Sequence, residues 1–341
     1  MRTLVTGGAG FIGRALVAQL LDAGHRVVVV DDYSNASPDN LASLMGHPGL
    51  EAVVEGDLRN PEVVDRLFVV DYDVVFHLAA SIRVQDSIDD PRTTFDNDVG
   101  VTFQVLEACR RQYFRLNGVP LRGAFHLDAQ LPRLVDRRPR LVFTSTCMVY
   151  DRAEDRPIDE AHPTRPASPY AASKIAAENL VLSYGHSYRM PVRVARPFNT
   201  YGPYQKSNLE GGVVAIFLAN ALAGLPLRVK GTGEQTRDLL FVSDCAEFLE
   251  RLGTTDDTAL DGLVVNAATG EDVSINALAE RIAAGFVPVE HVPHDHPQAE
   301  IQRLVGDARR AAETVGWRPR TSLEEGLAQT LAFLASRSQT P

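Results

Sequence analysis

Short apolar runs of strand length alternate with longer amphipathic stretches through the first half of the chain. In the longer stretches the apolar residues recur at helical spacing. Strands and helices that alternate in this way are typical of a parallel sheet covered by helices on both faces. The predicted strands are Thr3–Thr6, Arg26–Val30, Ala52–Val54, Val74–His77 and Leu141–Ser145, and the clearest predicted helices are Phe11–Ala23 and Thr93–Arg111.

The alternation changes at two places. Residues 112–140 form a mixed basic and apolar stretch with several prolines, which we interpret as an insertion into the main domain. After Pro197 the elements become shorter and glycine and proline more frequent, which predicts a main domain of residues 1–196 and a smaller lobe of residues 197–341. The strand Arg193–Arg196 and a segment near Arg237–Asp244 are expected to return to the main sheet.

A glycine-rich run follows the first predicted strand and opens the first predicted helix. Its glycines Gly7, Gly10 and Gly13 allow backbone amides to approach a pyrophosphate at the positive end of the helix that begins with Phe11 and Ile12. A tight strand-to-helix turn without a ligand is the alternative. The run favours a Rossmann-type α/β fold, a doubly wound parallel sheet that binds a dinucleotide, with a smaller C-terminal lobe for the substrate.

The second predicted strand ends in two aspartates, Asp31 and Asp32, at the place where a carboxylate meets the adenosine ribose hydroxyls of a dinucleotide. A carboxylate there would repel a 2′-phosphate, and no arginine stands next to it in the sequence, so NAD is favoured over NADP. Asp57, followed by Leu58, comes after the third strand. We expect Asp57 either to accept hydrogen bonds from the adenine or to cap the helix that begins at Pro61.

A candidate acid/base pair lies at the start of a later helix. Ser168 is a suitable capping residue before Pro169, so Tyr170 and Lys174 fall on one face of that helix. A phenol has a pKa of about 10 in water, and a neighbouring ammonium group lowers it. Tyr170 is then able to take the proton of a substrate hydroxyl while hydride leaves for NAD. Thr146 ends a predicted strand and is expected to hydrogen-bond the reacting oxygen, although threonine is also a common strand residue.

With these motifs the sequence resembles the extended short-chain dehydrogenase/reductase family, in its nucleotide-sugar epimerase and dehydratase branch. The resemblance implies a catalytic triad of Thr146, Tyr170 and Lys174 and a tightly bound NAD. It also implies that Asn199 and Arg237 hold the diphosphate of a UDP- or TDP-linked sugar, the arginine through charge-assisted hydrogen bonds. By the same resemblance, the segment that lines the cofactor after the fourth strand contains Leu78, Ala79 and Ala80.

Further substrate contacts follow from a looser match to the same branch. Arg83 aligns with a lysine that galactose epimerases carry near the cofactor. Glu300 and Arg303 lie where family members contact the ribose and phosphate of the nucleotide, and a surface ion pair is the alternative for them.

Several positions depart from the pattern of the branch. Dehydratases and decarboxylases carry glutamate two residues after the catalytic threonine, where this chain has Met148, and a thioether cannot act as the base that elimination requires. Cys147 stands where dehydratases have an aspartate, so its thiol is either an acid or a small buried group. Asp98 stands where the family commonly has asparagine.

These departures favour a 4-epimerase that works through a transient 4-keto sugar, for which Thr146, Tyr170, Lys174 and NAD suffice. The alternatives are a nucleotide-sugar dehydratase and a UDP-glucuronate decarboxylase. A sensor that binds NAD without turnover is disfavoured because it needs no proton relay, and an NADPH reductase is disfavoured by Asp31.

Composition limits the partners and the compartment. The net charge of −10 is spread along the chain, which argues against nucleic acid as a partner. No apolar stretch approaches the length of a membrane span, and no charged leader precedes the first strand, so we expect a cytoplasmic protein. Three cysteines without metal-type spacing fit a reducing compartment. No metal site is expected, because a solvated loop is favoured over a metal site for His291–His296. By resemblance alone, Thr93–Arg111 and Pro169–Tyr184 are expected to form a homodimer interface.

Overall fold

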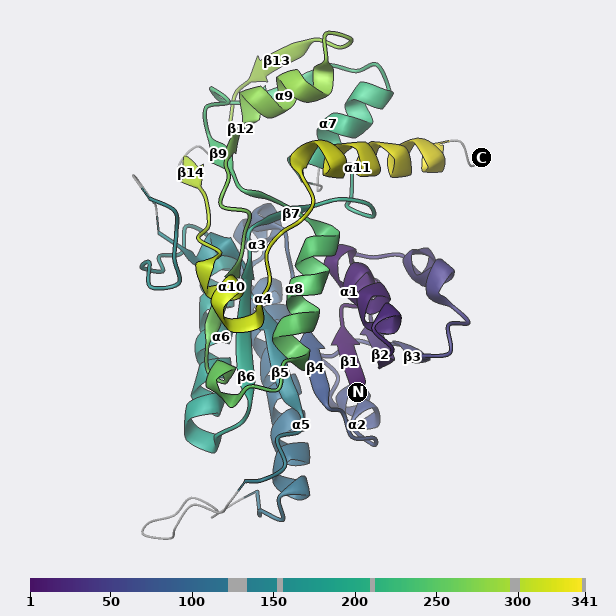
Figure 1. The fold of residues 1–341 in the computed structure, drawn as a ribbon, viewed down its shortest axis with the longest axis vertical. Helices are drawn as coiled ribbons and strands as arrows, with labels where there is room; N and C mark the ends of the chain where they lie inside the picture. Colours follow the sequence, from purple (N-terminus) through teal and green to yellow (C-terminus); the bar gives the residue numbers. More distant parts are fainter. Residues whose placement is uncertain (122–133, 152–155, 209–211, 295–300, 339–341) are drawn as a thin grey trace. The chain divides into compact units, whose positions relative to one another are not determined.

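The computed structural model describes residues 1–121, 134–151, 156–208, 212–294 and 301–338. Its central feature is a seven-stranded sheet with the strand order β11-β6-β5-β4-β1-β2-β3, and all pairings from β6 to β3 are parallel (Figure 1). The predicted doubly wound α/β fold is therefore confirmed, because strands are added on both sides of β1. The strands are β1 (Arg2–Thr6), β2 (Arg26–Asp31), β3 (Leu50–Glu55), β4 (Val74–His77), β5 (Arg140–Thr144), β6 (Val192–Pro197) and β11 (Val264–Ala267).

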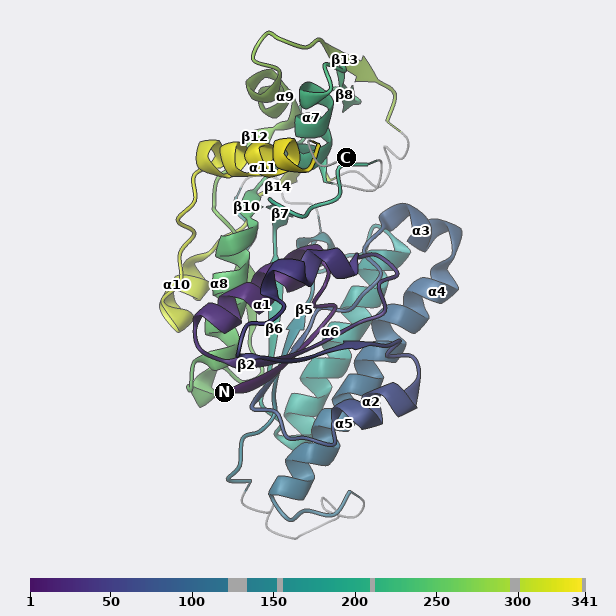
Figure 2. The same cartoon turned by 90° about the vertical axis from the view of Figure 1, so that its right-hand side faces the viewer.

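Helices cover both faces of this sheet. On one face, residues of α2, α5 and α6 form one core cluster with Val30, Val75 and Phe143 of the strands. On the other face lie α1 and the last turns of α8, where a Cβ added at Gly253 would lie 2.3 Å from the ring of Phe76 (Figure 1 and Figure 2). The helices are α1 (Phe11–Asp22), α2 (Pro61–Leu67), α5 (Val101–Leu116), α6 (Pro169–Tyr188) and α8 (Val242–Thr254).

The stretch predicted as one helix over Thr93–Arg111 is interrupted. A short helix α4 (Pro91–Phe95), which follows α3 (Val84–Asp89), passes into a π-helical turn, Asp96–Gly100, before α5 begins. A π-helical turn holds one extra residue, but the apolar residues before and after it keep ordinary helical spacing, so the sequence pattern does not reveal the turn. The prediction of one continuous helix was therefore wrong in this detail. The predicted insertion also begins later than Gln112, because α5 continues to Leu116. Much of the insertion, residues 122–133, lies outside the described residues.

Gln112 is held in α5 by the main chain before β4. Its side-chain amide donates to the carbonyl of Tyr72 at 2.7 Å and its oxygen accepts from the Tyr72 amide at 3.2 Å. This pair of hydrogen bonds and the burial of Tyr113 and Phe114 in the core fasten the last turns of α5 to the first unit.

The chain divides into two compact units. The first comprises Met1–Ser145, Ser168–Ala195 and Leu249–Val265, and the second comprises Thr146–Ala167, Arg196–Phe248 and Asn266–Pro341. In the second unit, α7, α9, β8 and β10 contribute to a separate core cluster. Its remaining elements are β7 (Asn199–Tyr201), α7 (Val213–Leu222), β8 (Leu227–Lys230), β9 (Thr236–Arg237), β10 (Leu239–Phe241), β12 (Val273–Ser274), α9 (Ile275–Ala283), β13 (Val289–Val292), β14 (Arg303–Leu304), α10 (Arg309–Val315) and α11 (Leu323–Ser338).

Two local expectations fail in this unit. The segment Arg237–Asp244 does not return to the main sheet, because β10 pairs with β7 in a sheet of two strands. The strand that joins the main sheet from this part of the chain is β11. His291 is not in a loop either, because it belongs to β13, which pairs with β8. Strands of two to four residues carry too little pattern to reveal their partners.

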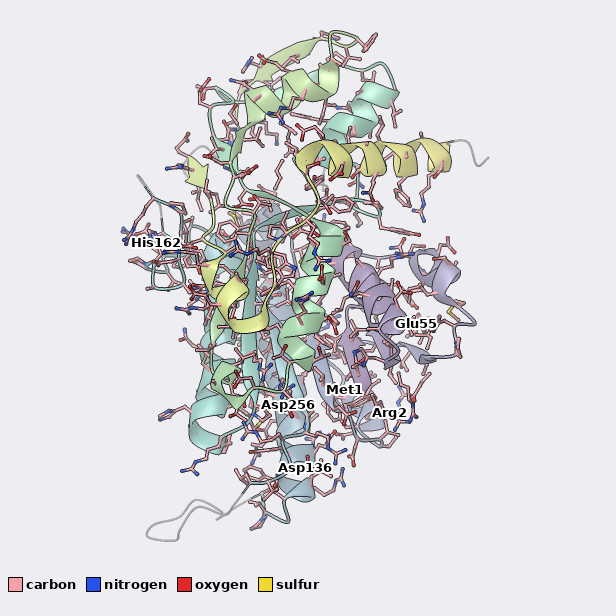
Figure 3. The ribbon with its side chains drawn as sticks, viewed as in Figure 1. Met1, Arg2, Glu55, Asp136, His162 and Asp256 are labelled. Carbon is pink, nitrogen blue, oxygen red and sulfur yellow. The ribbon has the colours of Figure 1, made fainter. Side chains whose placement is uncertain are left out.

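Two arginines are buried where α8 ends. Arg193 is fully buried in β6 and donates to the carbonyls of Leu252 at 2.6 Å and Asp257 at 2.7 Å. Arg140 donates to the carbonyl of Gly253 at 2.8 Å. The last carbonyls of a helix have no partner within the helix, so these guanidinium groups replace the missing donors. Asp256, just after α8, is labelled in Figure 3.

No helix among the described residues is long and apolar enough to cross a membrane.

Candidate active site

The glycine loop between β1 and α1 is packed tightly against its surroundings. Gly7 has a φ of +66°, and a Cβ there would lie 2.9 Å from the amide nitrogen of Ala79. A Cβ at Gly13 would lie 2.1 Å from the carbonyl oxygen of Gly7. Gly10 is the N-cap of α1, and no described side chain caps that helix end. Backbone amides at a helix N-terminus that no side chain occupies fit a pyrophosphate, as the sequence predicted.

Asp31 and Asp32 differ in where their carboxylates lie. Asp31 is 8% exposed and accepts from the amides of Ala9 and Tyr33, both at 2.9 Å. Burial raises the pKa of Asp31, and these amides lower it in part. Asp32 is exposed and accepts from the amide and hydroxyl of Ser34. Asp31 is therefore the aspartate that faces the glycine loop.

Asp57 does not cap the helix that follows it. That position is taken by Asn60, whose side chain accepts from the amide of Glu62 at 3.0 Å, so the capping alternative for Asp57 was wrong. Asp57 instead pairs with Arg59 at 2.7 Å, which lowers the pKa of the carboxyl. Leu58 between them is buried. Arg59 was missed by the sequence reasoning, although it is two residues from a predicted contact.

The segment after β4 is fixed to the end of β1. The amides of Leu78 and Ala79 both donate to the Thr6 hydroxyl at 3.2 Å, and that hydroxyl also contacts Nδ1 of His77 at 2.7 Å. Nε2 of His77 lies 3.1 Å from the hydroxyl of Thr102 in α5. These contacts place the predicted cofactor-lining segment beside the glycine loop, since Gly7 closely approaches Ala79.

Tyr170 and Lys174 lie in the first turns of α6, which Ser168 caps by accepting from the amide of Ala171. Both side chains are buried, and the Lys174 ammonium donates to the carbonyl of Thr144 at 2.8 Å. It also lies over the ring of Phe143, 4.5 Å from the centroid. Burial lowers the pKa of Lys174, and the carboxylates of Asp98 and Glu178 raise it.

The end of β5 carries buried hydroxyls that are still available to a ligand. Among the described residues, the Oγ atoms of Thr144 and Ser145 are buried without a hydrogen-bond partner. A buried polar atom without a partner costs about 1–3 kcal/mol, so such atoms are commonly satisfied by something bound. Together with the glycine loop, these atoms fit a dinucleotide at the carboxyl ends of the strands.

A short turn, Cys147–Val149, follows Thr146. The Thr146 hydroxyl accepts from the amide of Met148 at 3.2 Å and so caps this turn. Cys147 is buried, and burial raises the pKa of its thiol to about 12, so the thiol stays protonated at neutral pH. Neither a thiolate nor a carboxylate is therefore present in this turn.

The predicted substrate residues of the second unit lie on short strands. Asn199 begins β7, and its Oδ1 atom is buried without a partner among the described residues. Arg237 ends β9 and donates to the carbonyls of Thr236 and Ile301. Asp238, which sequence reasoning missed, is fully buried and accepts from the amides of Gly270 and other loop residues, so it fixes the loops around Arg237.

Of the remaining candidates, Arg303 lies close to Arg237, because β14 pairs with β9 and Arg303 is opposite Thr236 in that pair. Arg83 pairs with Asp86 at the start of α3, and Arg303 lies 3.3 Å from Asp272. Glu300 lies outside the described residues. The described residues contain no group of three or more histidines, cysteines or acidic residues that could hold a metal ion.

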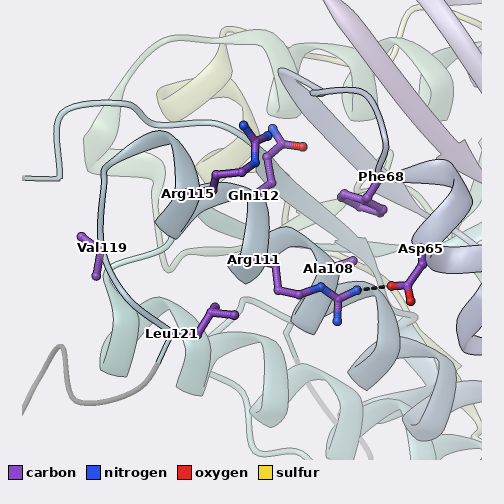
Figure 4. A pocket seen from close by; sticks show the side chains of 8 residues that line it. All are labelled: Asp65, Phe68, Ala108, Arg111, Gln112, Arg115, Val119 and Leu121. Carbon is purple, nitrogen blue, oxygen red and sulfur yellow. Dashed lines mark hydrogen bonds and ion pairs between the residues drawn. The ribbon is translucent and has the colours of Figure 1, made fainter.

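A pocket of about 430 Å³ lies elsewhere, between α2 and α5 (Figure 4). Asp65, Phe68, Arg111 and Arg115 are among the residues that line it, and Arg111 pairs with Asp65 at 2.7 Å. No predicted site residue lines this pocket.

The fold and the glycine loop define a Rossmann-type, dinucleotide-binding protein with a tyrosine–lysine pair. The family model "NAD dependent epimerase/dehydratase family" matches residues 3–268, and the chain belongs to this family. The predicted family and its NAD cofactor are thereby confirmed.

Individual relatives divide among the reactions of this family. The chain is 37% identical to UDP-glucose 4-epimerase of Mycolicibacterium smegmatis, over 99% of this chain and 100% of the relative. It is 33% identical to UDP-glucuronic acid decarboxylase 6 of Arabidopsis thaliana, over 96% and 87%. Among solved structures it is similar to Pal from Bacillus thuringiensis, with 45% identity, a TM-score of 0.89 and coverage of 99% and 100%.

Proposed function

We propose that this protein is an NAD-dependent 4-epimerase of a nucleoside-diphosphate sugar, with a UDP- or TDP-linked hexose as substrate. The observation that carries the choice of reaction is the turn after Thr146. It presents the protonated thiol of Cys147 and the thioether of Met148, and neither is a base for elimination. The likeness to UDP-glucose 4-epimerase supports the same choice.

The residues of the chain divide the work of such a reaction. Tyr170 takes the proton from the C4 hydroxyl and later returns one to the C4 oxygen, while Thr146 hydrogen-bonds that oxygen. Lys174 supplies the positive charge that makes the phenol acidic. NAD, held by the glycine loop and Asp31, would supply reversible hydride transfer at C4. Asn199 and Arg237 hold the diphosphate, so that the sugar ring is able to rotate and present its other face while the nucleotide stays bound.

A panel of UDP- and TDP-linked sugars, including UDP-glucose and UDP-glucuronate, tests this proposal. Products are separated by mass and by NMR. An epimerase changes the stereochemistry at C4 without a change of mass, whereas loss of water or of carbon dioxide identifies a dehydratase or a decarboxylase and contradicts the proposal. Heating the purified protein is expected to release NAD, which its absorbance spectrum identifies.

Tyr170→Phe is expected to lower turnover by about 10²–10⁴-fold, because it removes the acid/base group and keeps the ring. Tyr188→Phe, in the last turn of the same helix, is the matched control and is expected to keep the parent rate. A Tyr170→Phe variant that converts its sugar as fast as the parent would contradict this mechanism.

We further propose a cytoplasmic homodimer. The three cysteines are free and buried in the structure, which fits a reducing compartment. Phe95 on α4 and Phe103 on α5 are apolar residues 53% and 45% exposed, on the stretch expected to form the dimer interface. Analytical ultracentrifugation that shows a monomer at micromolar concentration would refute the dimer.

A further inference from the structure

The π-helical turn between α4 and α5 carries a carboxylate into the interior of the first unit. Asp98 stands in the middle of this turn and is 1% exposed. Asp96, two residues earlier, is partly exposed and pairs with Arg92 on the surface. Turns of this kind occur often at functional sites, because the extra residue redirects side chains relative to a regular α-helix.

Both carboxylate oxygens of Asp98 accept hydrogen bonds from neighbouring segments. Oδ1 accepts from the amide of Ser81 at 2.8 Å, and Oδ2 accepts from the hydroxyl of Ser173. Ser81 follows the cofactor-lining residues after β4, and its own hydroxyl accepts from the side chain of Asn97 at 2.8 Å. Ser173 immediately precedes Lys174 in α6. Asp98 therefore ties the start of α6 to the segment beside the glycine loop.

The charges around Lys174 come from three elements. Asp98 in the π-helical turn and Glu178 in α6 both raise the pKa of Lys174 against the effect of burial. His77 in β4 faces the same ammonium but is neutral, because burial lowers its pKa to about 3. Burial raises the pKa of Asp98 itself, and Lys174, Ser173 and Ser81 lower it. A buried ammonium is costly without opposite charge nearby, and of the two carboxylates Asp98 has the larger effect on the pKa of Lys174.

We infer that Asp98 is a positioning residue of the Tyr170–Lys174 pair: its buried carboxylate balances the Lys174 ammonium and fixes α6 against the cofactor-lining segment. This inference rests on the proposed function, in which that pair moves the proton. A negative charge nearby opposes loss of a proton from the ammonium and from the phenol alike. Removing the charge is therefore expected to make both groups more acidic.

Asp98→Asn tests the charge while keeping the shape. The amide oxygen still accepts from the Ser81 amide, and the NH₂ group donates to the Ser173 hydroxyl, which is then free to donate to the carbonyl of Tyr170, 2.8 Å away. Asp96→Asn, in the same turn but partly exposed and paired with Arg92, is the matched control for the change in net charge. Both variants are loaded with NAD before measurement.

Two readouts are compared. The first is the pH profile of turnover, whose acid limb reports Tyr170 and whose alkaline limb reports Lys174. The second needs no substrate: it is the tyrosinate absorbance of each protein minus that of its Tyr170→Phe counterpart, followed as a function of pH. In Asp98→Asn both limbs and the absorbance midpoint are expected to move to lower pH by about one unit, and in Asp96→Asn all three are expected to stay in place.

The outcomes separate this inference from the proposed function. A shifted absorbance midpoint in a protein that epimerises no sugar supports the role of Asp98 and contradicts the function. Epimerase activity with unshifted limbs and an unshifted midpoint contradicts the role of Asp98 and leaves the function standing, and an upward shift overturns the role as well.

If Asp98→Asn folds but is too unstable for measurements across the pH range, thermal unfolding at one pH decides. An unpaired buried ammonium should then be the cause, so the double variant Asp98→Asn/Lys174→Met is expected to unfold at a higher Tm than Asp98→Asn alone. A double variant no more stable than the single one overturns the inference.

Discussion

Replacing Gly13 by alanine tests whether the close approach of Gly13 to the backbone of Gly7 and Gly8 shapes the cofactor site. The new Cβ would lie 2.1 Å from the carbonyl oxygen of Gly7 and 2.8 Å from the Cα of Gly8, and both are backbone atoms that no rotamer change can move. The loop and α1 must therefore separate by roughly 1 Å. Overpacking of this kind costs about 3 kcal/mol, and the better helix propensity of alanine recovers about 1 kcal/mol, which leaves a net loss of about 2 kcal/mol.

The same displacement moves the amides that are expected to receive the pyrophosphate. A hydrogen bond to a charged group contributes about 1.5–3 kcal/mol, so losing one corresponds to roughly 10–100-fold weaker NAD binding. Calorimetric titration of NAD into protein stripped of cofactor measures this loss, and thermal unfolding measures the change in stability.

Gly100→Ala is the matched control, because Gly100 has an ordinary helical φ of −62° and no described atom beyond its chain neighbours and its own helix backbone lies within 4 Å of the added Cβ. It is expected to keep the parent affinity for NAD and to gain up to about 1 kcal/mol in stability. If Gly13→Ala binds NAD as tightly as the parent, the close approach does not shape the cofactor site and the reasoning fails.

Two further predictions concern stability. Arg193→Met leaves the Leu252 carbonyl without its donor and Asp261 without its buried partner, so it should lower the free energy of unfolding by about 3–5 kcal/mol, against less than about 1 kcal/mol for the exposed control Arg138→Met. Denaturant unfolding measures both, and equal losses would contradict the role of Arg193. The pKa of His77 is lowered to about 3, below about 6.5 in the unfolded chain, so only the unfolded chain gains a proton as the pH falls. Stability is therefore complete above about pH 6.5 and decreases toward pH 3, by about 2 kcal/mol between pH 6.5 and 5. Denaturant unfolding at both pH values should show this extra loss in the parent but not in His77→Gln, and equal losses would exclude His77 as its source.

The sheet and the cofactor loop were predictable because their signals are local. The buried strands and the run Gly7–Gly13 are each contained within one stretch of sequence, and the parallel pairing of the strands follows from their alternation with helices. The predicted roles of Tyr170 and Lys174 rest on the same kind of signal, a helix start marked by Ser168 and a spacing of four residues. Their roles in catalysis remain predictions.

The roles of buried charged residues were not predictable, because their partners lie far away in the sequence. Arg193 is a charged residue in a strand, and nothing near it in the chain indicates that the end of α8 will supply its acceptors. Asp98 was noticed only as a departure from a family pattern, because its meaning depends on Ser81 and Ser173, which lie 17 and 75 residues away. The interpretation of Asp57 as a helix cap failed because Asn60 offered the same chemistry closer to the helix.

The direction of the buried hydrogen bonds shows why the folded protein resists a second proton on His77. The Thr6 hydroxyl accepts from two amides, so its own proton points to Nδ1 of His77, and the proton of the neutral ring must then lie on Nε2 and point to Thr102. The Thr102 hydroxyl in turn donates to the carbonyl of Asp98.

A second proton on His77 would face the Thr6 proton, and one of these contacts would have to break. The contacts join the strand before the glycine loop, the segment at Ala79 and the turn that carries Asp98. Protonation of His77 in the folded protein would therefore disturb the cofactor loop and the counter-charge of Lys174 together. Because the pKa of His77 in the folded protein is about 3, this source of disturbance is absent between pH 6.5 and 5, where stability already falls, and calorimetric titration should find the same affinity for NAD in the parent and in His77→Gln at pH 5.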